Sequence, residues 1–221
     1  PSGVIVHPDG YNKESTVTDW FLSQYPESTG VGEPMTLKDG TIVDRPGVVH
    51  RLDTETSGVM ILARTQEAFT HLKRQFHDRH AQKEYRAFVY GVMKEDHGTI
   101  DRSIGRSAKD FRLRSAQRGA KGTLREAQTD WEVIVQNDMY AYLKIMPRTG
   151  RTHQIRVHMK AVNHPVVCDR LYAPNHDCVL GFDRLALHAH TLTLTLPDGE
   201  KKVFSTDLPL AFTEAEQQLR S

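Results

Sequence analysis

Asp53, in the segment VVHRLDTETSG at 48–58, has a carboxylate that could act in catalysis. Asp53 follows His50 and Arg51 and precedes a polar turn that ends in glycine. A carboxylate in such a turn usually accepts backbone N–H bonds, so the segment alone does not indicate catalysis. A catalytic role requires further side chains from elsewhere in the chain.

Three familiar kinds of site can be compared with this segment. The kinase catalytic loop is excluded, because it has no residue between its arginine and aspartate and needs an asparagine where this chain has Gly58. A glycosidase pair would combine Asp53 with Glu55, the nearest acid, and the sequence leaves that pair open. No familiar zinc motif is present, and scattered histidines are more often structural, so we predict no metal site. The side chains considered for one were His153, His158, His164, Cys168, His176 and Cys178.

A second cluster of polar residues, RTGRTHQIRVH at 148–158, lies about a hundred residues further along. Basic side chains at a glycine turn and a helix start can bind phosphate or carboxylate groups. A helix cap with surface arginines would account for the charge but not for the particular order of polar residues in RTGRTHQ. We therefore predict that Arg156 pairs with Asp53.

Composition limits the class of protein. The chain has 221 residues, of which 38% are hydrophobic and 26% charged, so we expect a folded globular protein. No stretch reaches the roughly 18 apolar residues of a membrane helix, and the start lacks the layout of a signal peptide. We expect a cytoplasmic protein whose two cysteines, Cys168 and Cys178, are free thiols. The missing initiator methionine suggests that an upstream segment is absent.

Charge is unevenly distributed although the net charge is only +1. One segment, 102–125, is rich in basic residues and has a single acid, Asp110. Such a segment is a candidate phosphate-binding surface, and a solvated loop with ordinary surface charge is the alternative. Its eight basic residues are Arg102, Arg106, Lys109, Arg112, Arg114, Arg118, Lys121 and Arg125.

Apolar periodicity and turn residues predict one α+β domain, 1–221, with a mainly antiparallel sheet. Thr65 and Thr152 are the expected N-caps of two helices. Helical spacing is present in 15–26, 65–80, 152–165 and 211–220. Strands are expected in 3–8, 58–65 and 83–93, and hairpins in 129–147 and 185–209, turning near Asn137-Asp138 and at Asp198-Gly199. The segment 27–44 is expected to be an exposed connection.

The order of these motifs resembles that of the RluA-type pseudouridine synthases. The matching segments occur in the family's order and span nearly the whole chain. They are PSGVIVHP (1–8), GVVHRLDTETSGVMILART (47–65), KEYRAFVYG (83–91), RTGRTHQIRVHMKAVNHPVVCDRLY (148–172) and RLALHA (184–189). Two departures are that the family commonly has Gly-Asp where this chain has Cys168-Asp169, and that a lysine usually precedes the proline that is Pro1 here.

The resemblance implies a large curved sheet with flanking helices, a central basic cleft, and isomerisation of uridine in RNA without cofactor or metal. It implies that Asp53 is the catalytic residue, acting as a nucleophile on the ribose or assisting formation of a glycal; the sequence does not choose between these. Arg156 would hold Asp53 ionised. Tyr85 would stack on the target base, and its alternative role is a core aromatic.

The resemblance also implies an RNA-binding set. Arg51 would enter the RNA helix at the place left by the flipped uridine, and Leu187 would form an apolar pocket wall. Structured RNA is the expected partner, ribosomal RNA before transfer RNA, and the protein is expected to be a monomer. A non-catalytic RNA-binding protein of ribosome assembly is the alternative. The predicted substrate-binding residues are His50, Arg51, Lys83, Arg151, His153, Gln154 and Leu187.

Overall fold

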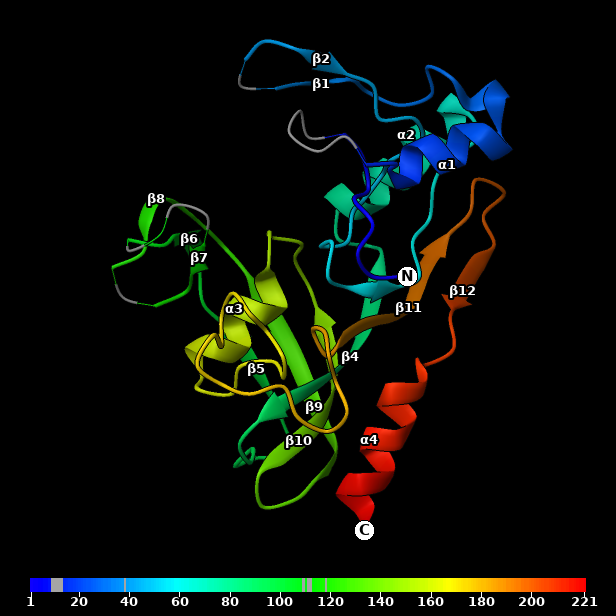
Figure 1. The fold of residues 1–221 in the computed structure, drawn as a ribbon. Coiled ribbons are helices and arrows are strands. Elements are labelled where there is room, and N and C mark those ends of the chain that lie inside the picture. Colours follow the sequence, from blue (N-terminus) through cyan, green and yellow to red (C-terminus); the bar gives the residue numbers. More distant parts are fainter. Residues whose placement is uncertain (9–13, 38, 109, 111–112, 118) are drawn as a thin grey trace. The chain divides into compact units, whose positions relative to one another are not determined.

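The computed structural model describes residues 1–8, 14–37, 39–108, 110, 113–117 and 119–221 (Figure 1). The chain forms two compact units, each assembled from separate stretches of sequence. Unit 1 is Pro1–Gln82 with Leu192–Ser205, and unit 2 is Lys83–Thr191 with Thr206–Ser221. Each unit is described by itself, and the expectation of one domain stays a prediction.

The largest sheet in the described residues has seven strands in the order β12-β11-β4-β10-β9-β5, with β3 paired to β11. The β4–β10, β10–β9 and β9–β5 pairs run antiparallel, so that Tyr85 lies opposite Ile145, which in turn lies opposite Trp131. The predicted α+β class with a mainly antiparallel sheet is confirmed. The strands are β3 (Ser57–Gly58), β4 (Gln82–Tyr90), β5 (His97–Asp101), β9 (Gln128–Gln136), β10 (Tyr140–Pro147), β11 (Leu187–Thr195) and β12 (Lys201–Ser205).

Both predicted hairpins are confirmed. The β9–β10 turn is held by the Asn137 side chain, whose Oδ1 accepts hydrogen bonds from the backbone of Met139 and Tyr140. An amide acceptor that mimics a backbone turn is the reason asparagine is common at such positions. The β11–β12 turn closes through the backbone of Leu196 and Glu200, with Gly199 at φ +88°.

The core of unit 2 lies between this sheet and two helices. Helices α3 (Gln154–Ala161) and α4 (Leu210–Arg220) both pack against β9 and β10. Phe88 stacks on Tyr142 at 4.3 Å between ring centroids, and Phe212 meets Phe88 edge-on. All three are almost completely buried, and this packing fixes β4, the strand that carries Lys83 and Tyr85.

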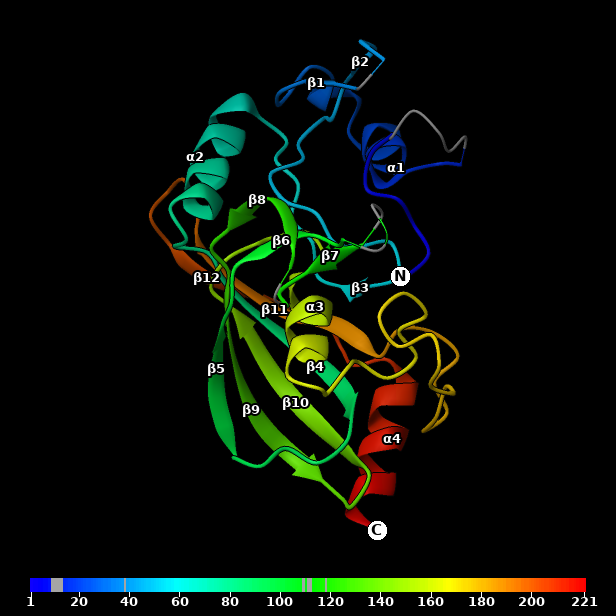
Figure 2. The same cartoon turned by 90° about the vertical axis from the view of Figure 1, so that its left-hand side faces the viewer.

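A smaller sheet in unit 2 has three strands in the order β7-β6-β8 (Figure 2). Its strands are β6 (Ile104–Arg106), β7 (Arg114–Ser115) and β8 (Lys121–Arg125). Of the basic residues predicted to bind phosphate, Arg106, Arg114, Lys121 and Arg125 lie in this sheet, and Arg102 precedes it. The other three, Lys109, Arg112 and Arg118, lie outside the described residues.

The described residues of the first stretch of unit 1 contain two helices, a 3₁₀ turn and a two-stranded hairpin. Thr16 caps the first helix in a capping box with Asp19, and Thr65 caps the second, as predicted for Thr65. The elements are α1 (Val17–Gln24), η1 (Pro26–Ser28), β1 (Met35–Thr36), β2 (Ile42–Val43) and α2 (Gln66–His77). Helix α2 is joined to the β11–β12 hairpin by Gln75, whose side-chain amide forms two hydrogen bonds with the backbone of Thr195.

Two local predictions in unit 1 are wrong, and a third is right only in part. Residues 3–8 are not a strand, because the carbonyls of Ile5 and Val6 accept hydrogen bonds from the first turn of α1 instead of joining a sheet. Of the strand expected at 58–65 only Gly58 is in β3, and Leu62 forms an isolated bridge with Val48. The connection expected at 27–44 is mostly exposed where the structure describes it, but it contains the end of η1 and the β1–β2 hairpin.

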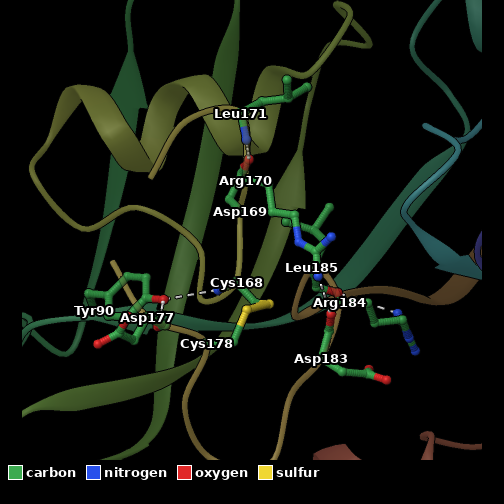
Figure 3. The surroundings of a disulfide bond; sticks show 10 residues. All are labelled: Tyr90, Cys168, Asp169, Arg170, Leu171, Asp177, Cys178, Asp183, Arg184 and Leu185. Atoms are coloured by element: carbon green, nitrogen blue, oxygen red, sulfur yellow. Dashed lines mark hydrogen bonds between the residues drawn. A yellow bond between two sulfur atoms is a disulfide. The ribbon is translucent and has the colours of Figure 1, made fainter. Parts of the chain in front are cut away.

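The predicted free thiols are also wrong, because Cys168 and Cys178 form a disulfide (Figure 3). The ten-residue separation allows the loop to turn back and bring the two Cα atoms to 4.5 Å. Separately, none of the helices in the described ranges is long and apolar enough to cross a membrane.

Gly47 permits the close approach that shapes the Asp53 loop. Its φ is +68°, and a Cβ there would lie 2.5 Å from the Ala63 carbonyl oxygen and 2.9 Å from the Phe21 ring. We expect Gly47→Ala to lower the free energy of unfolding by about 3 kcal/mol, since it adds overpacking to left-handed strain. Gly199→Ala, at φ +88° with nothing within 4 Å, should cost only about 1 kcal/mol. Equal losses in urea unfolding would refute the clash.

Candidate active site

Asp53 lies at the far end of a loop in unit 1 whose two arms are bonded to each other. The Ala63 amide donates to the Gly47 carbonyl, and the adjacent residues Val48 and Leu62 form an antiparallel β-bridge. At the tip, the Thr56 amide donates to the Asp53 carbonyl over 2.9 Å. The Asp53 side chain is half-buried, so the loop presents a carboxylate on a backbone that is fixed on both sides.

His50 helps to hold that loop. Its Nε2 accepts a hydrogen bond from the Ile61 amide, which requires an unprotonated Nε2, and its ring stacks on Phe76 at 4.5 Å between centroids. These contacts give His50 a structural role three residues before Asp53. Its predicted contact with substrate stays a prediction.

Arg51 is exposed and lines a cavity of about 290 Å³ in unit 1. Leu52 and Thr54, the two neighbours of Asp53, line the same cavity. The other lining residues are Gly3, Ile5, Val6, His7 and Glu14. A mixed polar and apolar lining next to a cationic side chain suits a polar organic group.

In unit 2, the turn after β10 is held together by the Gln154 side chain. Its Oε1 accepts from the Thr149 hydroxyl and the Arg151 amide, and its Nε2 donates to Gln128 and Thr129. Gln154 is 5% exposed, so the amide serves to fix the turn at the start of α3. The predicted contact of Gln154 with RNA is not required to explain its position.

Lys83, at the start of β4, reaches the same turn. Its Nζ donates to the Thr149 carbonyl over 3.0 Å. Burial, with a smaller effect from the Arg151 charge, lowers the pKa of Lys83 to about 8. Arg151 itself donates from Nε to the Glu126 carbonyl, so these two predicted binding residues lie together.

The lowered pKa of Lys83 predicts a pH-dependent stability. Between pH 8 and 10.5 the unfolded chain binds more protons at this side chain than the folded one, so folding becomes more favourable as pH rises. We expect the difference in unfolding free energy between the parent chain and Lys83→Met to increase by about 2 to 3 kcal/mol over that window. Urea unfolding at several pH values measures it. Lys94→Met, at an exposed lysine, is the control.

His153 precedes α3 in a left-handed conformation, with φ +56°, and is the N-cap residue in place of the predicted Thr152. Its Nδ1 shares a 2.8 Å hydrogen bond with the Tyr172 hydroxyl, which also accepts from the Arg114 amide. Tyr172 thereby connects the start of α3 to the small basic sheet. The predicted role of His153 in substrate binding stays a prediction.

Arg156 is almost completely buried and forms a two-pronged ion pair with Asp169. Its Nε donates to Oδ2 and its Nη2 donates to Oδ1, each over 2.7 Å, and the centroid of the Tyr172 ring lies 5.2 Å from the guanidinium carbon. Asp169 Oδ1 also accepts from the backbone amides of Leu171 and Tyr172. Two parallel charge-assisted bonds fix the plane of the guanidinium. Because Arg156 belongs to unit 2 and Asp53 to unit 1, their predicted pairing stays a prediction.

Tyr85 and Leu187 come from strands of the large sheet. Tyr85 is half-buried on β4 and packs against the main core of unit 2, whereas Leu187, the first residue of β11, is 3% exposed within it. The core contact of Tyr85 matches the alternative role named for it, and stacking on a base stays a prediction for this residue.

Sequence reasoning missed Asp169 and Tyr172 as the residues that hold Arg156. Their signal was present in the segment VVCDRLY, where an acid follows two buried valines and precedes a tyrosine by three residues. The sequence prediction gave Arg156 a single partner, Asp53, and therefore did not include Asp169. No group of three or more metal-ligating side chains converges within the described ranges.

Comparisons of the sequence with family models and with known proteins agree with each other. A family model described as RNA pseudouridylate synthase matches residues 1–161. An uncharacterised RNA pseudouridine synthase of Synechocystis sp. is 36% identical over 100% of this chain, which corresponds to 64% of that relative. The ribosomal large subunit pseudouridine synthase D of Neisseria meningitidis serogroup B is 37% identical over 95% of this chain and 54% of that relative. The chain thus spans about half to two thirds of the length of these relatives.

Solved structures give the same fold. Human RNA pseudouridylate synthase domain containing 1 matches with a TM-score of 0.69 and 26% identity, covering 88% of this chain and 74% of that one. Human RNA pseudouridylate synthase domain containing 4 matches with a TM-score of 0.72 over 100% of this chain and 87% of that one. At 24% identity, the second likeness concerns the fold alone.

Proposed function

We propose that this chain, which belongs to the RNA pseudouridylate synthase family, isomerises uridine to pseudouridine in structured RNA. The observation that carries the proposal is the family match over 1–161, which contains all three residues predicted to be catalytic, Asp53, Tyr85 and Arg156. Support also comes from Arg156, whose guanidinium is already fixed by a buried ion pair.

The reaction exchanges one glycosidic bond for another. The bond between uracil N1 and ribose C1′ breaks, the base turns, and a bond forms between C5 and C1′. The proton on C5 passes to solvent and N1 takes up a proton, so the product is an isomer and no redox partner is required. Asp53 would act at the ribose, either by attacking C1′ or by removing a sugar proton to form a glycal.

Two side chains would assist Asp53. Arg156 would stabilise the ionised form of the carboxylate, since a nearby opposite charge favours ionisation. Tyr85 would stack on the uracil while it turns. The backbone is fixed by the bonded loop arms around Asp53 and by β4 around Tyr85, and the guanidinium of Arg156 is fixed by its ion pair with Asp169. Such preorganisation is what a reaction that must hold a detached base requires.

A uridine in a stem must leave its helix before it can react, which costs a few kcal/mol. Arg51, an exposed cation two residues before Asp53, is the residue we assign to the space that the base leaves. Contacts between basic side chains and phosphates would offset the cost of flipping.

The small sheet of unit 2 is the surface we assign to those phosphates. Arg106 on β6 lies directly opposite Arg114 on β7 and opposite Lys121 on β8. Directly opposed residues in a sheet share a face, and like charges in that arrangement repel each other. A row of like charges on one face is suited to a polyanion outside the protein.

Arg106 stands in the middle of this basic row, and its replacement gives a quantitative test. We expect Arg106→Gln to weaken RNA binding and to reduce the slope of log affinity against log salt by about 1, as for loss of one phosphate contact. Arg220→Gln on α4, where Arg220 pairs with Glu216, removes the same charge elsewhere and should leave the slope unchanged. Filter binding at several salt concentrations measures both. Identical slopes for the two variants would refute the assignment.

Large-subunit ribosomal RNA is the substrate we favour, in a cytoplasmic enzyme, because the Neisseria relative bears that activity in its name. The test uses transcripts of ribosomal and transfer RNA labelled with tritium at C5 of uridine. Isomerisation releases tritium to water, and carbodiimide-dependent stops in primer extension locate the product. Release from ribosomal RNA is expected. Binding without release from either RNA would favour the alternative of a non-catalytic RNA-binding protein.

A further inference from the structure

The loop closed by the disulfide carries both residues that hold Arg156. This disulfide loop, Cys168–Cys178, contains Asp169, which binds the guanidinium through two hydrogen bonds, and Tyr172, whose ring lies 5.2 Å from it. Asp169 directly follows Cys168 in the chain (Figure 3). A change at the disulfide is therefore one peptide bond away from the ion pair.

Cys168 has a backbone conformation that cysteine rarely adopts. Its φ is +58°, in the left-handed region, where a Cβ is disfavoured and glycine is the usual residue. Such a residue persists only where its surroundings restrain it strongly. The disulfide is one restraint on Cys168, because it joins the side chain to Cys178 on the other arm of the loop.

Tyr90 provides a second, weaker restraint across the same two arms. Its hydroxyl accepts a hydrogen bond from the Cys168 amide over 3.1 Å and donates one to the Asp177 carbonyl over 2.6 Å. Both bonds lie beside the disulfide in Figure 3. The loop is thus closed covalently and by a tyrosine bridge, and only the covalent closure depends on redox conditions.

We propose that the Cys168–Cys178 disulfide is a redox-sensitive clasp that keeps Asp169, and through it Arg156, in position. With the bond intact, Cys168 is held in its left-handed conformation and the carboxylate that follows it is aligned with the guanidinium. With the bond reduced, Cys168 relaxes towards an ordinary conformation and the ion pair shifts. The proposal deepens the proposed function, on which its consequence for activity rests.

The redox step requires a dithiol. One thiolate of the reagent attacks the sulfur of Cys178, the exposed member of the pair, and the S–S bond breaks with Cys168 leaving as a thiolate. The second reagent thiol then displaces Cys178 and forms the reagent's own disulfide. Two electrons pass to the protein, which takes up two protons as its thiols form. In a reducing compartment, protein disulfides are usually transient or redox-sensing, which suits this role.

The first experiment compares oxidised and dithiothreitol-reduced protein, with the redox state verified by thiol alkylation and mass spectrometry. We expect reduction to lower kcat for tritium release by about 5-fold or more, with little change in KM for RNA, and reoxidation to restore it. Equal kcat values in two verified redox states would overturn the proposal. So would a protein in which alkylation finds both cysteines as thiols after oxidation.

Two variants separate the clasp from a general loss of structure. Cys178→Ser cannot form the disulfide and should have the low kcat in every redox condition. Adding Cys168→Gly to it supplies a residue that adopts φ +58° without restraint, so kcat should return towards that of the oxidised protein and stay insensitive to dithiothreitol. Circular dichroism and thermal unfolding confirm that each variant is folded. A double variant no more active than Cys178→Ser would contradict the positioning role.

A direct readout of Arg156 keeps this test independent of activity. The Nε–H of Arg156 is buried in a hydrogen bond to Asp169, and a ¹⁵N NMR signal assigned by comparison with Arg156→Lys should shift or broaden on reduction. If no tritium is released in either state, the proposed function fails while this signal still decides the clasp. An unchanged signal after verified reduction would refute the clasp alone.

Discussion

Asp53→Asn is expected to bind structured RNA about as tightly as the parent chain and to release tritium from uridine at a rate lower by about 10⁴-fold or more, as for loss of a residue that acts on the reacting bond. The amide keeps the size of the side chain but can neither attack C1′ nor remove a sugar proton. The Asp53 backbone bond to Thr56 is unaffected by the change, so the loop should keep its shape. Single-turnover tritium release and filter binding on the same RNA measure the two effects.

Glu55→Gln is the matched control for Asp53→Asn. It makes the same chemical change two residues away, at the acid that a glycosidase-type pair would use. Activity within a few-fold of the parent chain is expected. A loss as large as that of Asp53→Asn would mean that two carboxylates share the work, and residual isomerisation by Asp53→Asn itself would contradict the assigned mechanism.

Asp169→Asn is the substitution with the second largest expected effect. It leaves the buried guanidinium of Arg156 without the charge that its two hydrogen bonds compensate, and breaking a buried pair in this way typically costs about 3 to 5 kcal/mol. Urea unfolding measures the loss. Asp183→Asn, at an exposed acid further along the chain, should change the unfolding free energy by less than about 0.5 kcal/mol.

Replacing both partners of the ion pair distinguishes stability from function. Arg156→Met combined with Asp169→Asn removes both charges together and keeps Oδ1 of residue 169 as the acceptor for the backbone amides of Leu171 and Tyr172, so no buried charge is left uncompensated. We expect this double variant to recover most of the unfolding free energy that Asp169→Asn loses, and to release little tritium because Arg156 is missing. A double variant that unfolds as easily as Asp169→Asn would show that packing, and not the uncompensated charge, causes the loss.

The parts of the fold that the sequence predicted are those that local chemistry decides. Thr65 caps α2 through its own hydroxyl, and the β9–β10 turn depends on the side chain of Asn137, so a few neighbouring residues suffice to predict each. The strand predicted at residues 3–8 was wrong because alternating apolar residues do not show which segment their backbone will pair with. The carbonyls of Ile5 and Val6 bond to the first turn of α1, a contact that no periodicity encodes.

The candidate site divides in the same way. The segments carrying Asp53 and Arg156 were recognisable because their residue types and order are specific, and the resemblance supplied their roles. The Asp169 ion pair and the disulfide were not recognised, since each depends on how the chain folds back after α3. Two cysteines ten residues apart carry no signal for pairing until the turn between them is known.

Unit 1 is built from two separate stretches of the chain, and this determines when its fold can be completed during synthesis. Leu192 and Leu194 belong to the same apolar cluster as Phe69 and Leu72, and α2 is bonded to Thr195 through Gln75. A ribosome that makes this chain therefore produces the Asp53 loop more than a hundred residues before the hairpin that completes its core. The nascent first segment must keep an unfinished apolar surface in the meantime, and the loop gains its final support only when β12 has emerged.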